Sequence, residues 1–359
     1  MAEKYSRFRD PGTGIQVFLT PVCSSSTSMN SGLASARLTT WMLTPIWILL
    51  GLVRSLLALV GWLIYVCGSA VGLRLVLFAL GFVRLPLDPG DNKRDPDRCK
   101  RQRVQPQKRD LVLANHSSWI DLLIVAYLYP GVKFLVPVID DARTPQTTPP
   151  NAHAQSVPRR TPKKNAMSAH TNMDTRTPSA ADIVVTGYAI LGLSQAIWFV
   201  GGLAPSRAQL DAATRVYASI DRAISHASCA LVMFPEGTTC NNRALLSMSV
   251  LPTCAPATIR TTHLVTLKYS PPTRTSISSI YTTRTPHNSI VRHAARLVFL
   301  CSPLRSVLLK SAVLPSHPTA WPDHVASAIS NLARLKTTTI HWSAKADFLH
   351  MVETRSRRA

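Results

Sequence analysis

A nearly uninterrupted apolar stretch from Trp41 to Val83 constrains the fold of this 359-residue chain more than any other feature. Its only charged residues are Arg54 and Arg74, and the 55–73 segment between them has about 19 residues, enough for a helix that crosses a bilayer core. The stretch predicts either one spanning helix near 55–73 or a two-helix hairpin that enters one leaflet and returns. The alternative is a buried helix pair in a soluble protein, although helices that are apolar on all sides need a very large core.

The charge of the chain is lopsided, with 40 Lys and Arg residues against 18 Asp and Glu residues and a formal net charge of +22. Such an excess implies an anionic partner, either nucleic acid or a lipid surface. The apolar stretch favours lipid, and no nucleic-acid partner is expected because no motif interleaves aromatic and basic side chains. The basic residues of segment 85–110 then predict a juxtamembrane loop on the cytoplasmic face.

The cysteines are scattered along the chain. Their positions form no CxxC pair and no Cys/His cluster, which argues against a zinc site and against a secreted disulfide framework. The thiols are therefore expected to stay reduced, and no metal ligands are predicted. The seven residues are Cys23, Cys67, Cys99, Cys229, Cys240, Cys254 and Cys301.

Beyond the apolar stretch, short apolar runs alternate with helical patterns. Strands are expected at 111–114, 134–139, 230–234 and 264–267, and near 337–341, and helices from about residue 117 and at 323–336. This alternation predicts an α/β domain with a mixed sheet flanked by helices, preceded by the membrane-anchoring helix or hairpin. The expected organisation is a polar N-terminal segment (1–40), a membrane anchor (41–84), the basic loop (85–110), the α/β domain (111–345) and a basic tail (346–359).

Four segments have less regular patterns. Residues 140–181 are rich in Thr, Pro, Asn and Arg, which predicts a disordered insertion or translated intron sequence. Residues 183–203 are long enough for a second spanning helix, but their glycines and β-prone pieces favour a buried helix plus strand. Residues 208–226 predict an amphipathic surface helix. Residues 290–314 predict a basic amphipathic helix, either on a membrane surface or packed on the sheet.

The first polar motif, Asn115 to Asp121, follows the apolar run 111–114. A buried strand is expected to end at Asn115 and a helix to start near Ser117 or Ser118, which leaves His116 at the mouth of the turn. Asp121 follows within about one and a half helical turns, so its carboxylate can fold back to the imidazole. The pair is either a general base with its carboxylate or a helix entry with a first-turn charge.

The second motif, Phe234-Pro235-Glu236-Gly237-Thr238, also stands at the end of an expected strand. Gly237 permits a tight turn whose amides can point at an oxyanion, and Thr238 adds a hydroxyl. Arg243 can donate to a phosphate, and Glu236 is expected to orient an arginine or substrate hydroxyls. Ligands gather at the carboxyl ends of strands in α/β domains, so the two motifs together predict a site.

Together the two motifs resemble the glycerolipid acyltransferases, also called lysophospholipid or 1-acylglycerol-3-phosphate acyltransferases. That family carries His-x4-Asp, seen here as His116 to Asp121, and Phe-Pro-Glu-Gly-Thr, seen here as Phe234 to Thr238. Residues 8–14 and 238–246 resemble the fungal lysophosphatidic acid acyltransferase branch. The spacing between the motifs, 234 − 116 = 118 positions, is longer than the family usually shows, and the insertion at 140–181 accounts for the excess.

The resemblance implies roles for particular residues. His116 would be the general base and Asp121 its partner, while Phe234 to Thr238 and Arg243 would hold substrate. The family also has an apolar strand followed by an acceptor-binding arginine. That strand would lie near 197–200, where Gly201 and Gly202 follow it, and the nearest arginine is Arg207.

The resemblance further implies a membrane-bound enzyme that moves an acyl chain from acyl-CoA to the free hydroxyl of lysophosphatidic acid, giving phosphatidic acid. Acyl-CoA is a co-substrate, and no further cofactor is expected. The expected location is the endoplasmic reticulum membrane or the lipid droplet, with the site on the cytoplasmic side. The alternatives are a lysophosphatidylcholine or lysophosphatidylinositol acceptor, or an inactive protein that tethers membranes or binds lipid.

Overall fold

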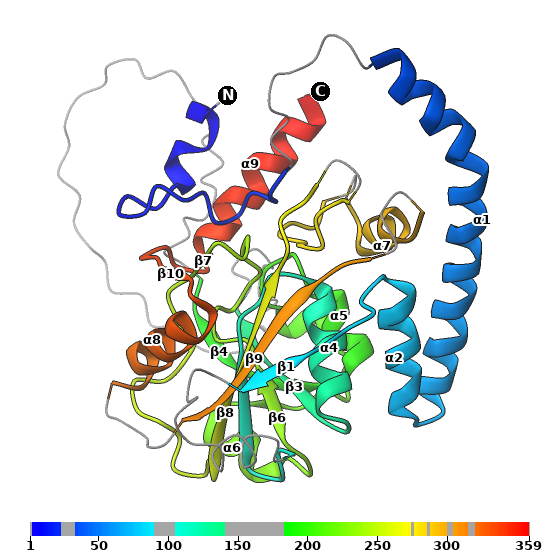
Figure 1. Ribbon diagram of the computed structural model, residues 1–359. Helices are drawn as coiled ribbons and strands as arrows, with labels where there is room; N and C mark the ends of the chain where they lie inside the picture. The colour runs from blue at the N-terminus through cyan, green and yellow to red at the C-terminus, as the bar shows by residue number, and fades with distance from the viewer. Residues whose placement is uncertain are drawn as a thin grey trace, which may run out of the picture.

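The computed structural model describes residues 2–22, 33–89, 105–140, 183–273, 276–285, 288–299, 304–314 and 320–358. Within these ranges an eight-stranded sheet has the order β1-β9-β8-β2-β6-β3-β4-β5, and β7 and β10 form a separate pair (Figure 1). The strands are β1 (Leu87–Pro89), β2 (Asp110–Ala114), β3 (Lys133–Ile139), β4 (Val185–Leu191), β5 (Val216–Tyr217), β6 (Leu231–Met233), β7 (Ala244–Leu245), β8 (Thr261–Tyr269), β9 (Val307–Leu314) and β10 (Lys336–Thr337).

The helices lie on both faces of the large sheet, so the expected α/β domain with a mixed sheet flanked by helices is confirmed. The α-helices are α1 (Leu33–Val66), α2 (Ala70–Ala79), α4 (Trp119–Leu128), α5 (Leu193–Trp198), α6 (Ile220–His226), α7 (Ile290–Phe299), α8 (Trp321–Ala333) and α9 (Ala344–Arg358). Two 3-10 helices, η1 (Ala2–Phe8) and η3 (Arg207–Gln209), complete the described elements.

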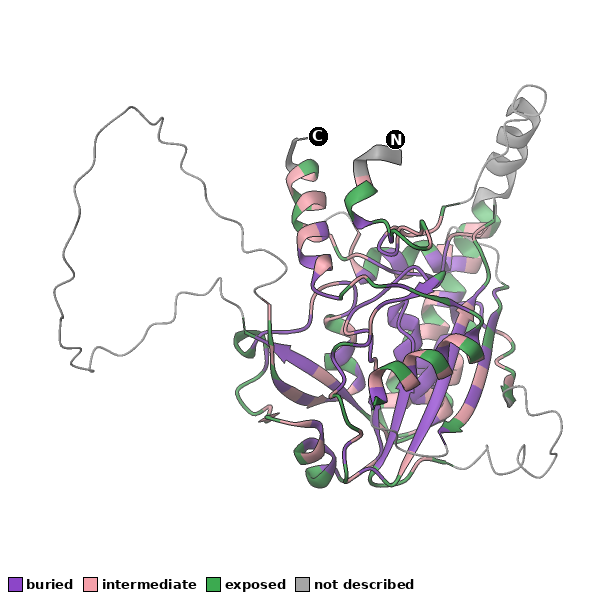
Figure 2. Cartoon of the chain, turned by 90° about the vertical axis from the view of Figure 1, so that its left-hand side faces the viewer, coloured by how far each residue is buried: buried purple, intermediate pink, exposed green. Residues whose placement is uncertain are grey.

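The central strands β8, β2, β6 and β3 run parallel to one another, and they bring the two sequence motifs together. Leu113 of β2 lies opposite Met233 of β6, so Asn115 and Phe234 leave the sheet at the same edge. Successive residues of β2 face opposite cores, because Val112 packs in the cluster that holds α2 and α4 while Leu113 packs in the cluster that holds α6 and α8. Burial on both faces explains the unbroken apolar run (Figure 2).

The apolar stretch folds as a helical hairpin. Helix α1 ends at Val66, Gly68 has φ +95°, and α2 begins at Ala70, so the single helix expected near 55–73 is wrong. The two helices approach closely at small residues: a Cβ added to Gly61 would lie 2.7 Å from the carbonyl oxygen of Gly72. Helix α2 lies between α1 and the rest of the domain (Figure 1).

One described helix, Pro45–Val66, is long and apolar enough to cross a membrane, with 22 residues. Arg54 lies inside it, yet this residue is buried against the domain. Its Nε donates to the carbonyl of Ala79 at 2.7 Å and one Nη to that of Val298 at 2.9 Å. The opposite side of the helix exposes large aliphatic side chains, among them Leu49, Leu56 and Leu63.

The expected insertion at 140–181 lies outside the described residues except for Asp140. Its two ends are adjacent, because β3 and β4 are antiparallel neighbours in which Ile139 pairs with Val185. The amide of Asp140 also donates to the carbonyl of Val184 at 3.3 Å. The segment therefore connects two strands that pair directly with each other. The strand pairing of the sheet that carries both motifs is made by residues outside this segment.

Three expected elements differ in the structure. Segment 183–203 contains a strand and a helix as favoured, but the strand is β4 and residues 197–200 end helix α5. The helix expected over 208–226 is confined to α6, because Val216 and Tyr217 pair with β4 instead. The helix expected over 290–314 ends at Phe299, and residues 307–314 form β9 against β8. Long-range pairing thus overrides helical periodicity at both places.

The two ends of the chain pack together (Figure 1). The expected polar N-terminal segment also contributes to the core, because Phe8, Val17 and Phe18 are buried in a cluster with Phe348 of α9. Helix α9 begins at Ala344, so residues 346–359 are not a separate tail. Both termini therefore belong to the folded domain.

Candidate active site

The first motif joins β2 to α4 as a capped helix start. Ser118 has extended backbone angles and accepts a hydrogen bond from the amide of Ile120 at 3.4 Å, and Asp121 accepts one from the amide of Ser118 at 2.7 Å. This capping box begins the helix at Trp119, within two residues of the expected start. Asp121 is therefore a first-turn residue of α4, and its carboxylate also reaches His116.

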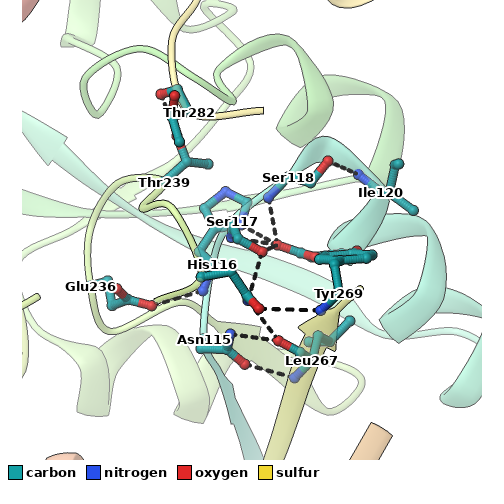
Figure 3. Close-up of polar contacts among 12 residues, drawn as sticks. Asn115, His116, Ser117, Ser118, Ile120, Glu236, Thr239, Leu267, Tyr269 and Thr282 are labelled. Atoms are coloured by element: carbon teal, nitrogen blue, oxygen red, sulfur yellow. Dashed lines mark hydrogen bonds and ion pairs between the residues drawn. The ribbon is translucent and has the colours of Figure 1, made fainter. Parts of the chain in front are cut away.

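His116 and Asp121 form a buried pair, and Figure 3 shows His116 with its neighbours Ser117, Glu236 and Tyr269. His116 Nδ1 lies 3.1 Å from Asp121 Oδ2, and the same oxygen accepts from the amide of Ser117 at 2.6 Å. His116 exposes 7% of its surface and Asp121 none. A carboxylate held at Nδ1 favours the tautomer with the proton on Nδ1, which leaves Nε2 as the basic nitrogen. That nitrogen makes no hydrogen bond with any residue the structure describes.

The second oxygen of Asp121 has a partner that the sequence motifs do not contain. Tyr269, the last residue of β8, donates its hydroxyl proton to Asp121 Oδ1 at 2.5 Å. Burial, with the nearby Asp121 charge, raises the pKa of Tyr269 well above its ordinary value, so the phenol stays a proton donor at neutral pH. Asp121 is therefore held from both sides.

The second motif packs directly on the first. The Phe234 ring stacks on the His116 ring with centroids 4.1 Å apart, and Phe134 stacks behind Phe234. Pro235 is buried beside them. The two motifs, 118 residues apart in sequence, thus form one site, and the stacking limits rotation of the imidazole.

Glu236 bonds backbone amides instead of the arginine or substrate hydroxyls that it was expected to orient. The side chain is fully buried, Oε1 accepts from the amide of His116 at 2.9 Å, and Oε2 accepts from the amide of Leu246 at 3.1 Å. Burial raises the pKa of Glu236 to about 7, although these two donors act in the opposite direction. Glu236 belongs to the second motif, so its carboxyl group links that motif to His116, just after β2, and to Leu246, just after β7.

The tight turn expected at Gly237 is present, but the Gly237 amide and the Thr238 hydroxyl donate to backbone carbonyls instead of pointing outward at an anion. Gly237 has φ +67°, a left-handed conformation that strains other residues, and its amide donates to the carbonyl of Phe234 at 3.0 Å. Thr238 donates its hydroxyl proton to the carbonyl of Gly202 at 2.9 Å. The turn is thereby attached to residues 201–205, which face it across a groove.

This groove starts at His116 and is mostly apolar. It contains a cavity of about 50 Å³, and Gly237, Thr238 and Thr239 line one side. Most of the other lining residues are contributed by α4, β3 and the chain that follows α5, among them Leu122, Phe134, Val136, Phe199, Val200 and Leu203. The site therefore places an apolar lining next to the His116 side chain.

The two arginines expected to hold substrate are not among the residues that line the groove. Arg207 is exposed in η3, and its guanidinium donates to the carbonyl of Thr214 at 2.5 Å. Arg243 is exposed just before β7. The structure brings His116, Asp121 and residues 234–238 together and leaves these arginines outside.

Two asparagines complete the site, and sequence reasoning missed their roles. Asn115 exchanges two hydrogen bonds with the backbone of Leu267, at 2.9 and 2.8 Å. Asn242, at φ +58°, donates to Ser117 Oγ and to the Leu267 carbonyl, and accepts from the amide of Tyr269. Continuing the period-2 pattern of the expected strand 264–267 would have placed Tyr269 on the face of Leu267. No local signal identifies Asn242.

A buried lysine supports the groove from the C-terminal helix. Lys345 is fully buried, and its ammonium donates to the carbonyl and the hydroxyl of Thr239 at 2.9 and 2.7 Å and to the carbonyl of Thr282. Burial lowers the pKa of Lys345 to about 7. Helix α9 is thereby attached to a residue that lines the groove.

Comparison of the chain with protein-family models, curated proteins and solved structures gave no match in any of the three. Among the described residues, no three His, Cys, Asp or Glu side chains gather in a way that could hold a metal ion.

Proposed function

We propose that this protein transfers an acyl chain from acyl-CoA to the free hydroxyl of a lysophospholipid, with lysophosphatidic acid as the acceptor. The observation that carries the proposal is the His116–Asp121 pair, in which Nδ1 lies 3.1 Å from the carboxylate at the end of an apolar groove. A histidine oriented in this way takes a proton from a hydroxyl, and the groove suits an acyl chain. The resemblance of the two motifs to glycerolipid acyltransferases adds the substrate class.

In the proposed reaction, His116 Nε2 removes the proton of the acceptor hydroxyl as its oxygen attacks the thioester carbonyl. Asp121 keeps the other nitrogen protonated and stabilises the imidazolium that forms. When the tetrahedral intermediate collapses, the bond to sulfur breaks and the imidazolium returns the proton to the leaving thiolate. The products are the new ester and free CoA, and no covalent enzyme intermediate is required.

The hairpin of α1 and α2 supports a location at a membrane. The exposed aliphatic side of Pro45–Val66 is long enough to insert, and both proposed substrates partition into lipid. We place the protein in the endoplasmic reticulum membrane or on lipid droplets, with the groove on the cytoplasmic side, where the basic residues of 85–110 favour anionic lipid.

The test is acyl transfer from labelled acyl-CoA to lysophosphatidic acid by the full chain in membranes from a host strain with low background. His116→Ala is expected to lower kcat by about 10²- to 10⁴-fold, because the general base is gone. His226→Ala is the matched control, since this histidine is exposed on α6, and its rate is expected to stay at wild-type level. Near-normal transfer by His116→Ala would refute the proposal.

A panel of acceptors tests the headgroup. None of the arginines that the structure describes lines the groove, so the preference for lysophosphatidic acid rests on the resemblance alone. Faster transfer to lysophosphatidylcholine or lysophosphatidylinositol would keep the chemistry and change the acceptor. Absence of transfer to every acceptor would favour the tethering or lipid-binding alternative.

A further inference from the structure

The hydrogen bonds of Asp121 are distributed unevenly between its two oxygens. Oδ2 accepts from the amides of Ser117 and Ser118 at 2.6 and 2.7 Å and from the Ser117 hydroxyl at 3.4 Å, and it contacts His116 Nδ1 at 3.1 Å. Oδ1 accepts from the hydroxyl of Tyr269 at 2.5 Å, the one hydrogen bond to this oxygen from the residues that the structure describes. The contact with His116 is longer than the two amide bonds to the same oxygen.

The surroundings of Oδ1 offer no replacement for that hydroxyl. Asp121 is 0% exposed, and the Tyr269 ring packs edge-on against Phe82 at 6.0 Å. Without the Tyr269 hydroxyl, Oδ1 would be a buried carboxylate oxygen with no hydrogen-bond donor, which is unfavourable. The carboxylate would then rotate so that each of its oxygens accepts from one of the two backbone amides. Those amides are fixed by the helix cap, and turning toward them moves Oδ2 away from His116.

Tyr269 is itself held in place from the second motif. Its amide donates to Asn242 Oδ1 at 3.2 Å, and Asn242 also donates to Ser117 Oγ at 3.1 Å. Asn242 has φ +58°, a strained conformation that the surrounding contacts maintain. The phenol is thus fixed relative to both the helix cap and the turn at the groove.

We propose that Tyr269 is a positioning residue of the catalytic pair, and that its hydroxyl keeps the Asp121 carboxylate in the orientation that directs Oδ2 to His116 Nδ1. The inference rests on the proposed function, and it adds a third member, from β8, to the pair in the first motif. Tyr269 touches neither substrate in this scheme and acts through Asp121.

The experiment measures kcat and KM of Tyr269→Phe in the full-length membrane-bound protein, with lysophosphatidic acid and acyl-CoA varied in turn. Rates are expressed per mole of folded protein, quantified as the protease-resistant domain. The expected result is a fall in kcat of about 10- to 100-fold, the effect of one hydrogen bond to a charged group, with both KM values within about twofold of wild type. Tyr188→Phe is the matched control, because its hydroxyl bonds the backbone carbonyl of Val250 and not the His116–Asp121 pair, and its kcat is expected to stay within about twofold.

A second measurement separates positioning from general structural damage. In an Asp121→Asn background the carboxylate is absent, so adding Tyr269→Phe is expected to change kcat by less than about twofold. This comparison also serves where Tyr269→Phe alone accumulates poorly, since the double variant carries no buried unpaired charge. An unchanged kcat in Tyr269→Phe, a loss confined to KM, or a further tenfold loss in the Asp121→Asn background would overturn the inference.

His116→Ala measured in parallel distinguishes the two failures. If His116→Ala abolishes transfer while Tyr269→Phe retains it, the acyltransferase proposal stands and only the role of Tyr269 is rejected. If His116→Ala transfers at the wild-type rate, the proposed function and the role of Tyr269 both fail.

Discussion

Shortening the connection between β3 and β4 tests whether the fold needs residues 141–182. The change replaces this segment with Asn-Gly, so that Asp140-Asn-Gly-Ile183-Val184 joins the paired residues Ile139 and Val185. A five-residue hairpin connection is common, and the strand ends already lie at hairpin distance because Asp140 bonds Val184. The site is expected to stay intact, since its residues come from other strand ends and turns.

The magnitude follows from the entropy of loop closure. The connection between Ile139 and Val185 falls from 184 − 140 + 1 = 45 residues to five, about ninefold. The free-energy cost of closing a loop grows as (3/2)RT times the natural logarithm of its number of residues, so this change stabilises the folded state by about 2 kcal/mol. For a domain of this size the midpoint of thermal unfolding is expected to rise by about 4–8 °C.

The assay is thermal inactivation of detergent-solubilised protein together with acyl transfer at 25 °C. The matched control replaces 141–182 with a Gly/Ser segment of equal length, which leaves the loop entropy unchanged and is expected to unfold like wild type. A midpoint below that of wild type, or loss of transfer in the shortened protein only, would show that the segment contributes contacts and would refute the reasoning.

Two further predictions concern buried polar groups. Glu236→Gln removes one of the two acceptor oxygens used by the amides of His116 and Leu246. It is therefore expected to lower the free energy of unfolding, measured by denaturant titration, by about 1–3 kcal/mol. An unchanged midpoint would show that these two hydrogen bonds do not stabilise the fold. Burial lowers the pKa of His293 from 6.5 to about 4, so the unfolded chain binds the proton first as pH falls. Relative to His293→Gln, the free energy of unfolding of the wild type is expected to fall by about 3 kcal/mol as the pH is lowered from 6.5 to 4. Parallel profiles of unfolding free energy against pH in the two proteins would contradict this.

The local signals in the sequence were strong enough to locate the core of the site. The short apolar run 111–114 predicts β2, and a helix start is expected near Ser117 or Ser118, so His116 had to lie between them. The strand before Phe234 was equally clear. Neighbouring parallel strands place such ends at one edge, which is why two motifs 118 residues apart could be expected to meet.

Other expectations failed where the answer depends on distant partners. Residues 216–217 and 307–314 are strands because β4 and β8 offer them free edges, which periodicity within each segment cannot reveal. The expected roles of Arg207 and Arg243 depended on where the ends of short loops point, and both side chains lie away from the groove lining. Glu236 looked like a substrate contact because its two backbone donors, His116 and Leu246, come from other segments.

The sequence by itself determined the apolar stretch at 41–83, the α/β alternation and the His116–Asp121 spacing, because these depend on burial and on contacts within a few residues. Only the tertiary structure decided how Asp121 is held. Its second partner, Tyr269, is 148 residues away and is fixed by Asn242, which lies after the other motif. A buried carboxylate needs donors from every side, and the chain can supply them only after the sheet has brought β2, β6 and β8 together.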